Sequence, residues 1–333
     1  MSDTNITSDD NTSLFDIGTQ QFYAIQFWIF LFLIIPSMIF ALFALYHLLR
    51  ERVLRQALYN HIIIILLIIN LFYQMTDVCL VIHYFRSYQS FIPTPTFRLF
   101  WGYIDWTFCT LQYFLYAWIT VERHILIFHD HLLSTRKKRF FIHYVPPVIL
   151  TIYCLLYYAI VFFASLCENT FDNITTISLY PCEFYNAAFG TYEILVDGII
   201  PCFTIVISSV ALLFRAVWQR YHMHRQIQWR QYRKMTLQVI IMSTIYMIFP
   251  FPYMIINFLY LCGMPSNIGA EFLSHAIFFP YYTLFLFPIV SVGALSELRE
   301  KVMSIIRFRR QRRIVGTLNN TRPHVTDNRV FLR

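Results

Sequence analysis

The sequence predicts an all-α membrane protein, a bundle of seven transmembrane helices with the amino end outside the cell. Of its 333 residues, 58% are hydrophobic and 13% are charged, whereas soluble domains average about 25% charged residues. Seven uncharged stretches each approach the length of one membrane-spanning helix, some after extension by a residue or two past a charge. They are residues 17–49, 56–76, 106–121, 140–167, 198–214, 235–270 and 272–296.

The basic residues predict the orientation of this bundle. Of the 26 Lys and Arg residues, all except Arg86 and Arg98 lie in the first, third and fifth connections or in the carboxyl-terminal tail. The amino tail has four Asp and no Lys or Arg. Because cytoplasmic loops are rich in Lys and Arg, the amino end is predicted outside. The net charge of +8 then faces anionic membrane lipid, and its spread over four segments excludes a nucleic-acid surface.

Four segments follow from this topology. Residues 1–21 form a polar extracellular tail with glycosylation sequons at Asn5 and Asn11, and a further sequon at Asn173 lies in the outer loop before the fifth helix. Residues 22–296 hold the seven helices. Residues 297–311 have an apolar face flanked by Arg and Lys and predict an amphipathic helix on the membrane surface. Residues 312–333 are expected to be a disordered cytoplasmic tail.

The helices can be placed one by one. The first runs over about 22–49, the second over about 56–84, and the fourth begins near Phe140. The fifth starts at about Ala187, the sixth near Lys234, and the seventh covers about 271–295. Prolines lie inside the fifth, sixth and seventh helices at Pro201, Pro250, Pro252, Pro280 and Pro288. A proline inside a span kinks the helix and leaves a backbone carbonyl that neighbouring helices must satisfy.

The third helix lies within residues 105–130, and its charges stand only at its two ends. No charged side chain occurs between Asp105 and the Glu122-Arg123 pair. Asp105 and Arg123 are 18 residues apart, about five turns, so they lie on one face of the helix. Cys109, Gln112, Tyr116 and Ile119 fill the same stripe. We interpret this as a helix that links an outer ligand site to an inner signalling site.

Seven cysteines allow a disulfide on the outer side. Cys79, Cys109, Cys154 and Cys202 fall within spans, where small apolar packing is the expected role. Cys167 and Cys182 bracket one outer loop and are predicted to bond, with Cys262 as a competing partner.

No motif points to an enzyme, a cofactor or a metal. The pairs His129/His131 and His222/His224 lack a cysteine cluster and helical i,i+4 spacing. No nucleophile elbow, phosphate loop or paired catalytic carboxylate motif occurs. We therefore expect no catalysis, no cofactor and no metal site.

Seven spans with Glu122-Arg123-His124 at the inner end of the third resemble the rhodopsin-like (class A) G-protein-coupled receptors, in particular invertebrate chemoreceptor-like members. Pro201, Pro252 with Tyr253, and Pro288 match the prolines of this family in helices five, six and seven. His124 stands where Tyr is usual, Asn70 where Asp is usual and Pro250 where Trp is usual. The resemblance covers about residues 22–308.

The resemblance implies a plasma-membrane receptor that binds an unknown extracellular ligand and activates a heterotrimeric G protein. It implies that Glu122 holds Arg123 at rest and that activation frees Arg123 to meet the G protein. The four lysines all lie at the inner face, so a retinal Schiff base is excluded.

The outer halves of the helices are acidic, which predicts a ligand that carries positive charge. Five acids lie there without a Lys: Asp77, Asp105, Glu193, Asp197 and Glu271. By resemblance, Asp105 stands where amine receptors pair an ammonium group, and Tyr281 where a Tyr bonds that Asp. The predicted ligand-binding residues are Asp105, Cys109, Glu193, Asp197, Tyr253 and Tyr281. An internal Arg98–Asp105 pair, or acids kept neutral by burial, would explain the same acids without a ligand.

Two membrane classes remain as alternatives, a seven-helix ligand-gated channel and a transporter. A transporter would show internal repeats with helices broken at matching positions, and none is recognisable. Odorant channels of the insect type have their amino end inside, which the distribution of basic residues opposes.

Overall fold

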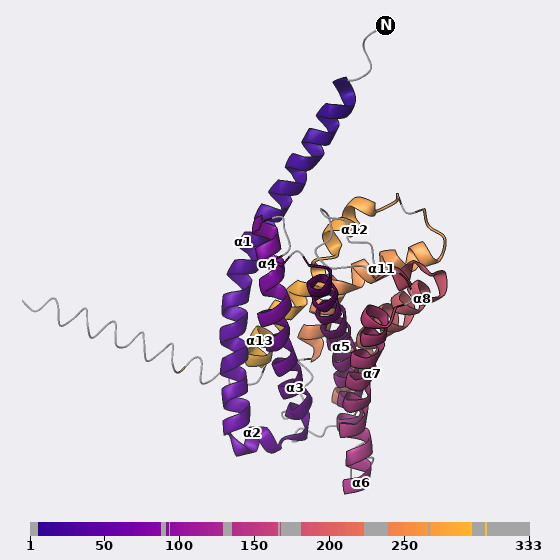
Figure 1. Ribbon diagram of the computed structural model, residues 1–333. Helices are drawn as coiled ribbons and strands as arrows, with labels where there is room; N and C mark the ends of the chain where they lie inside the picture. Colours follow the sequence, from indigo (N-terminus) through magenta and orange to yellow (C-terminus); the bar gives the residue numbers. More distant parts are fainter. Residues whose placement is uncertain are drawn as a thin grey trace, which may run out of the picture.

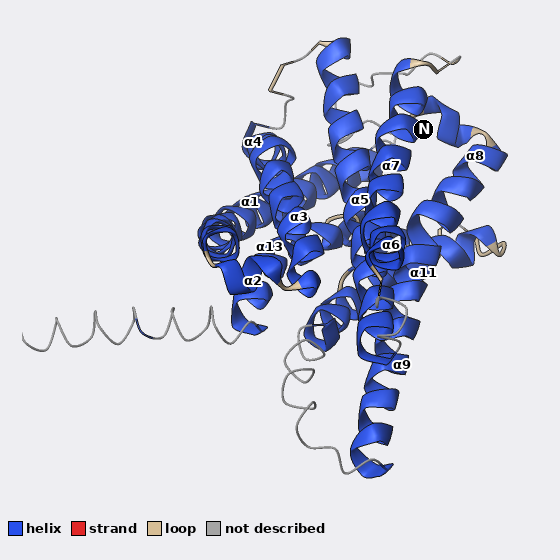
Figure 2. Ribbon diagram, turned by 90° about the horizontal axis from the view of Figure 1, so that it is seen from below, coloured by secondary structure: helices blue, strands red, loops and turns tan. Residues whose placement is uncertain are grey.

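A computed structural model covers the chain, and it describes residues 6–87, 91–92, 94–128, 135–165, 167, 181–222, 239–265, 267–294 and 304. Every regular element in this part of the chain is a helix (Figures 1 and 2). They are α1 (Ile6–Arg50), α2 (Arg52–Gln56), α3 (Leu58–Tyr73), η1 (Gln74–Val78), α4 (Cys79–Ser87), α5 (Pro95–Phe128), α6 (Arg136–Arg139), η3 (Phe140–Tyr144), α7 (Val145–Phe163), η4 (Cys182–Tyr185), α8 (Ala187–Tyr192), η5 (Glu193–Ile199), α9 (Ile200–His222), α11 (Pro250–Leu261), α12 (Ala270–Ala276) and α13 (Phe279–Ala294).

Five helical segments in the described residues are long and apolar enough to cross a membrane: Gln20–Arg50, Asn60–Ser87, Arg136–Phe163, Ala187–Arg215 and Ala270–Gly293. Val239–Ile248 and Pro250–Leu261 meet at a bend of 48° and make a sixth if they form one span. The prediction of an all-helical chain with several helices that could cross a membrane is therefore confirmed for the described residues, while the count of seven spans and the orientation stay predictions. The helix α5, expected as the third span, is not among these segments.

The two faces of α1 show how these helices suit a membrane. One face packs into the bundle through Phe30, Ile34, Ala41 and related positions at helical spacing. The opposite face is also apolar yet exposed, with Phe32 at 77% and Trp28 at 67% exposure. A helix that is apolar on every side needs an apolar solvent for its outer face, and lipid supplies one.

The helix α5 lies at the centre of the bundle, which explains its lower hydropathy. It is 34 residues long and packs against α7, α9 and α3, with α3 on one side and α7 on the other (Figures 1 and 2). Glu122, Arg123 and Thr120 are at most 1% exposed. Because neighbouring helices rather than lipid surround α5, it does not need apolar side chains on every face.

The two ends of the bundle differ in character. The short helices α2 and α6 lie at one end (Figure 1), and they carry Arg52, Arg55 and the run Arg136–Arg139. We call this the basic end. The helices α8 and α12 and the amino terminus lie at the opposite end (Figure 1), which we call the disulfide end because η4 begins there with Cys182.

The helix α1 begins earlier than the sequence indicates. It starts at Ile6 rather than near residue 22, and Figure 1 shows it extending beyond the other helices. Asn11 lies within α1, and the structure does not describe its side chain. Asn5, Asn173 and the segments 297–311 and 312–333, apart from Ser304, lie outside the described residues.

A proline in α13 is compensated by a neighbouring helix. Pro288 lacks an N–H, so the carbonyl of Leu284 one turn earlier has no intrahelical donor. The amide of Asn70 donates to this carbonyl at 2.9 Å, and that of Gln74 at 3.4 Å. Both amides are at most 1% exposed. The kink in α13 is therefore joined to the second span by hydrogen bonds in the bundle core.

Replacing Asn70 with leucine is expected to lower stability by about 1 kcal/mol, because the Leu284 carbonyl loses its better donor in an apolar core. The loss should shrink in a Pro288→Ala background, where the N–H of residue 288 restores the intrahelical bond. Thermal melting of the purified protein and its three variants measures this coupling. An equal loss in both backgrounds would contradict the assignment.

Candidate functional site

Two carboxylates near the disulfide end are held by aromatic donors from facing helices. Asp77 lies in η1, one turn after Tyr73, and Asp105 lies in α5, one turn after Trp101. The Trp101 indole N–H donates to Asp77 Oδ1 at 2.7 Å, and the Tyr73 hydroxyl donates to Asp105 Oδ1 at 2.6 Å. Each helix thus contributes one acid and one donor, which makes two cross-links one turn apart.

A third helix joins this group. The Tyr281 hydroxyl of α13 donates to Asp105 Oδ1 at 3.3 Å, so the structure brings together the two residues that the receptor resemblance pairs. We call Tyr73, Asp77, Trp101, Asp105 and Tyr281 the acid cluster.

A small cavity adjoins the acid cluster on the side of the basic end. It is lined by Tyr73, Cys109, Gln112, Tyr113, Tyr246, Pro280, Tyr281, Thr283 and Leu284. The space left among these side chains holds about one water molecule.

Three polar groups of the residues that line this cavity lack hydrogen-bond partners. The Tyr113 hydroxyl, the Thr283 hydroxyl and the Gln112 amide nitrogen are buried and make no hydrogen bond. Buried polar groups normally have partners, so three such groups around one cavity point to a ligand or water that supplies them. This makes the cavity, with the acid cluster above it, the candidate ligand site.

Glu193 and Asp197 belong to a different group. Both lie in η5 and face tyrosines of α7, since the Tyr158 hydroxyl donates to Glu193 Oε1 at 2.5 Å and that of Tyr153 to Asp197 Oδ1 at 2.8 Å. Neither acid lines the cavity beside Asp105, and neither does Tyr253 of α11. The single acidic ligand site expected from the sequence is therefore two separate acidic groups, and Glu271 of α12 is exposed and belongs to neither.

Each of the three π-helical turns in the described residues carries a buried ionisable side chain. Asp77 lies in η1, His143 in η3, and Glu193 with Asp197 in η5. A π turn inserts one residue into the α-helical repeat and re-aims the side chains around it. Hydrophobic periodicity does not reveal such turns, so the partners of these residues could not be predicted from the sequence.

At the basic end, Glu122 contacts a histidine from a neighbouring helix. Glu122 Oε1 shares a short hydrogen bond with His143 Nδ1, and its second oxygen has no hydrogen-bond partner. This bond joins α5 to η3 at the start of the fourth span, and the resting contact of Glu122 with Arg123 stays a prediction. His124, in the place of the usual Tyr, donates through Nε2 to the Ser208 carbonyl of α9 at 2.6 Å.

The bond to Glu122 continues through a second histidine. His143 Nε2 lies 3.2 Å from His61 Nδ1, and His61 Nε2 donates to the Arg55 carbonyl at 2.8 Å. Since that carbonyl can only accept, His61 Nε2 carries a hydrogen. These contacts join α2, α3, α5 and η3.

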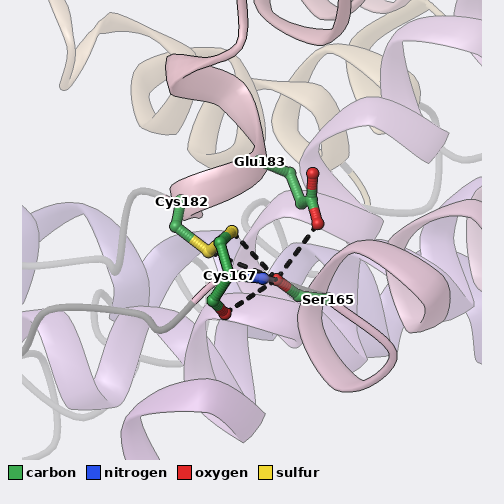
Figure 3. Close-up of a disulfide and its surroundings, with 4 residues drawn as sticks. All are labelled: Ser165, Cys167, Cys182 and Glu183. Atoms are coloured by element: carbon green, nitrogen blue, oxygen red, sulfur yellow. Dashed lines mark hydrogen bonds between the residues drawn. A yellow bond between two sulfur atoms is a disulfide. The ribbon is translucent and has the colours of Figure 1, made fainter.

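The predicted disulfide is confirmed. Cys167 and Cys182 are bonded, with their Cα atoms 6.1 Å apart, while Cys262 is free and exposed. Figure 3 shows Ser165 beside the bridge, where its hydroxyl lies 3.1 Å from Cys167 Sγ and donates to Glu183 Oε1 at 3.2 Å. The bridge ties the chain after α7 to η4, which leads into α8.

The described residues contain no group of three or more His, Cys, Asp or Glu side chains that could hold a metal ion. His129, His131 and His224 lie outside them. Comparison with models of protein families gives no match, and comparison with curated proteins gives none either. The contacts described above are thus what indicates a function.

Proposed function

We propose that the chain is a plasma-membrane G-protein-coupled receptor of the rhodopsin-like class, which binds a cationic extracellular ligand and activates a heterotrimeric G protein. One observation carries the proposal. The central helix α5 lines a small cavity near one end, where Tyr73 and Tyr281 of the lining bond Asp105, and it carries the buried Glu122 and Arg123 at the other end. A buried helix of this kind can transmit a change at one end to the other.

The proposal counts α5 as the remaining span, which with the bent pair as one span makes seven. Its 34 residues give a length of about 50 Å, more than the roughly 30 Å of a hydrocarbon core. The basic end is then cytoplasmic and the disulfide end extracellular, which agrees with the preference of Arg and Lys for cytoplasmic loops.

A stacked tyrosine pair connects the cavity to the inner end. Tyr246 lines the cavity and stacks on Tyr116 of α5, with ring centroids 4.6 Å apart and planes at 6°. The Tyr116 hydroxyl donates to the Val239 carbonyl at 3.5 Å. Because the cavity holds little more than a water molecule, a larger ligand must separate these helices. That separation would move the segment Val239–Ile248 relative to α5, the helix that carries Arg123.

The test is expression in cells with a promiscuous G protein, followed by a screen of cationic small molecules and peptides. We expect a ligand-dependent second-messenger response and an amino-terminal epitope that antibodies reach on intact cells. An epitope reached only after permeabilisation, together with a ligand-gated current that needs no G protein, would favour the channel instead.

A further inference from the structure

The small cavity that adjoins the acid cluster has the size of a single water molecule. Three polar groups of its lining have no hydrogen-bond partner within the described part of the chain: the Tyr113 hydroxyl, the Thr283 hydroxyl and the Gln112 amide nitrogen. Tyr113 is 5% exposed and Thr283 is 4% exposed. Buried polar groups are normally bonded to protein or to ordered water, so these three groups call for a partner.

Thr283 differs in its bonding from four other threonines within helical segments. The hydroxyls of Thr76, Thr151, Thr204 and Thr244 each donate to the carbonyl four residues earlier in the same helical segment, a common way for a threonine to satisfy its hydroxyl inside a helix. Thr283 of α13 makes no such bond. Its hydroxyl is therefore available to a partner outside its own helix.

The three groups together need a partner that both accepts and donates hydrogen bonds. Gln112 Nε2 can only donate, whereas the hydroxyls of Tyr113 and Thr283 can do either. Cys109 lies beside Tyr113, but a thiol is a weak donor and a weak acceptor. A water molecule both accepts and donates, and a buried water typically makes about three hydrogen bonds.

We propose that the cavity binds one ordered water molecule, which bridges α5 to α13 through Gln112, Tyr113 and Thr283. The cavity has no room for a larger organic ligand. None of the described lining residues is an acid, and the amide N–H of Gln112 disfavours a cation, so a metal ion fits the lining less well than water does.

The bridge adds to the contacts that hold α13 near its proline. Leu284 also lines the cavity, and its carbonyl receives the amide of Asn70 from the second span. The water bonds the adjacent residue, Thr283, to α5. Two neighbouring positions of α13 are thus fixed to two different helices, and a ligand too large for the cavity must expel this water to enter.

High-resolution cryo-electron microscopy of the purified full-length protein tests the site directly. We expect one isolated peak at hydrogen-bond distance, about 2.7–3.2 Å, from the Tyr113 and Thr283 hydroxyls and from Gln112 Nε2. The absence of this peak from a map that shows ordered water elsewhere would overturn the proposal. A peak with six or more oxygen neighbours, or one that is lost when choline chloride replaces sodium chloride at equal ionic strength, would indicate a metal cation instead.

Thermal melting of variants tests the bridge without a map. Thr283→Val removes one partner of the water, so the melting temperature should fall by about 2 °C, the scale of one lost hydrogen bond in a large domain.

Ser291→Ala is the matched control. Ser291 also lies in α13, is 0% exposed and has a hydroxyl without a hydrogen-bond partner among the described residues, but it does not line the cavity. Removing a buried hydroxyl that has no partner should leave the melting temperature unchanged or raise it. If Thr283→Val behaves in the same way, the proposal is wrong.

A double-variant cycle shows whether the two hydroxyls share one water. Tyr113→Phe alone should also lower the melting temperature. In the double variant with Thr283→Val the loss should be smaller than the sum of the two single losses, because the second substitution acts on a water that is already weakly held. Additive losses would assign the hydroxyls to separate partners and overturn the bridge. These measurements concern the bundle alone, so their outcome does not decide the proposed receptor function.

Discussion

Replacing Arg123 with alanine is expected to abolish signalling while cell-surface expression and ligand binding remain. Arg123 is 1% exposed at the inner end of α5, far along the helix from Asp105, so its removal does not touch the ligand site. Releasing this buried Arg from its resting contacts is expected to require a few kcal/mol, which ligand binding can supply. Without the guanidinium, the G protein loses the group that activation presents to it.

Three readouts check this prediction in the same cells: surface staining of an amino-terminal epitope, binding of the agonist found by screening, and second-messenger output. A variant that signals at the wild-type level would remove Arg123 from the switch. A variant that binds ligand normally yet stays silent agrees with the prediction.

His143 provides a control that should act in the opposite direction. Its bond to Glu122 joins α5 to the start of the fourth span. His143→Phe removes the hydrogen-bond partner of buried Glu122, and a buried polar group left unsatisfied typically costs about 1–3 kcal/mol. The resting arrangement should weaken, so we expect higher output without ligand. Silence of this variant at normal surface expression would show that the pair is structural only.

The helices followed from the sequence because hydropathy and length report burial in lipid directly. The described parts of the bundle fall where uncharged runs occur, and the Cys167–Cys182 pair followed from the two positions that bracket an outer loop. Pro288 likewise implied a carbonyl in need of a donor. Each of these features depends on local sequence alone.

The partners across helices did not follow from the sequence. The bonds from Asn70 to the Leu284 carbonyl and from His143 to Glu122 depend on how separate helices face one another. The π turns at η1, η3 and η5 change that facing by one residue, and no periodic pattern marks them. Asp105 and Tyr281, which the resemblance pairs, do form a hydrogen bond, whereas Glu193 and Asp197 bond tyrosines of α7.

The affinity of a cationic agonist should fall at least about tenfold on replacing Asp105 with asparagine, the scale of one lost charge-assisted hydrogen bond. Asparagine keeps the shape of the side chain and one acceptor oxygen for Tyr73 and Tyr281, so folding should be retained while the charge is lost. Equilibrium binding of the agonist to membranes measures the change directly. Surface expression of the variant verifies that it reaches the membrane.

Glu193→Gln is the matched control for Asp105→Asn, because it also replaces a buried carboxyl group in the outer half of the bundle with the corresponding amide. Glu193 bonds Tyr158 of α7 and does not line the cavity beside Asp105, so agonist affinity should change far less than in Asp105→Asn. Tyr281→Phe removes only a neutral donor, 3.3 Å from Asp105, so its loss of agonist affinity should lie between the losses of these two variants.

An agonist that is neutral or anionic, or whose affinity does not change in Asp105→Asn, would contradict a cationic site. Equal losses from Asp105→Asn and Glu193→Gln would instead indicate that long-range charge, and not contact with Asp105, attracts the ligand.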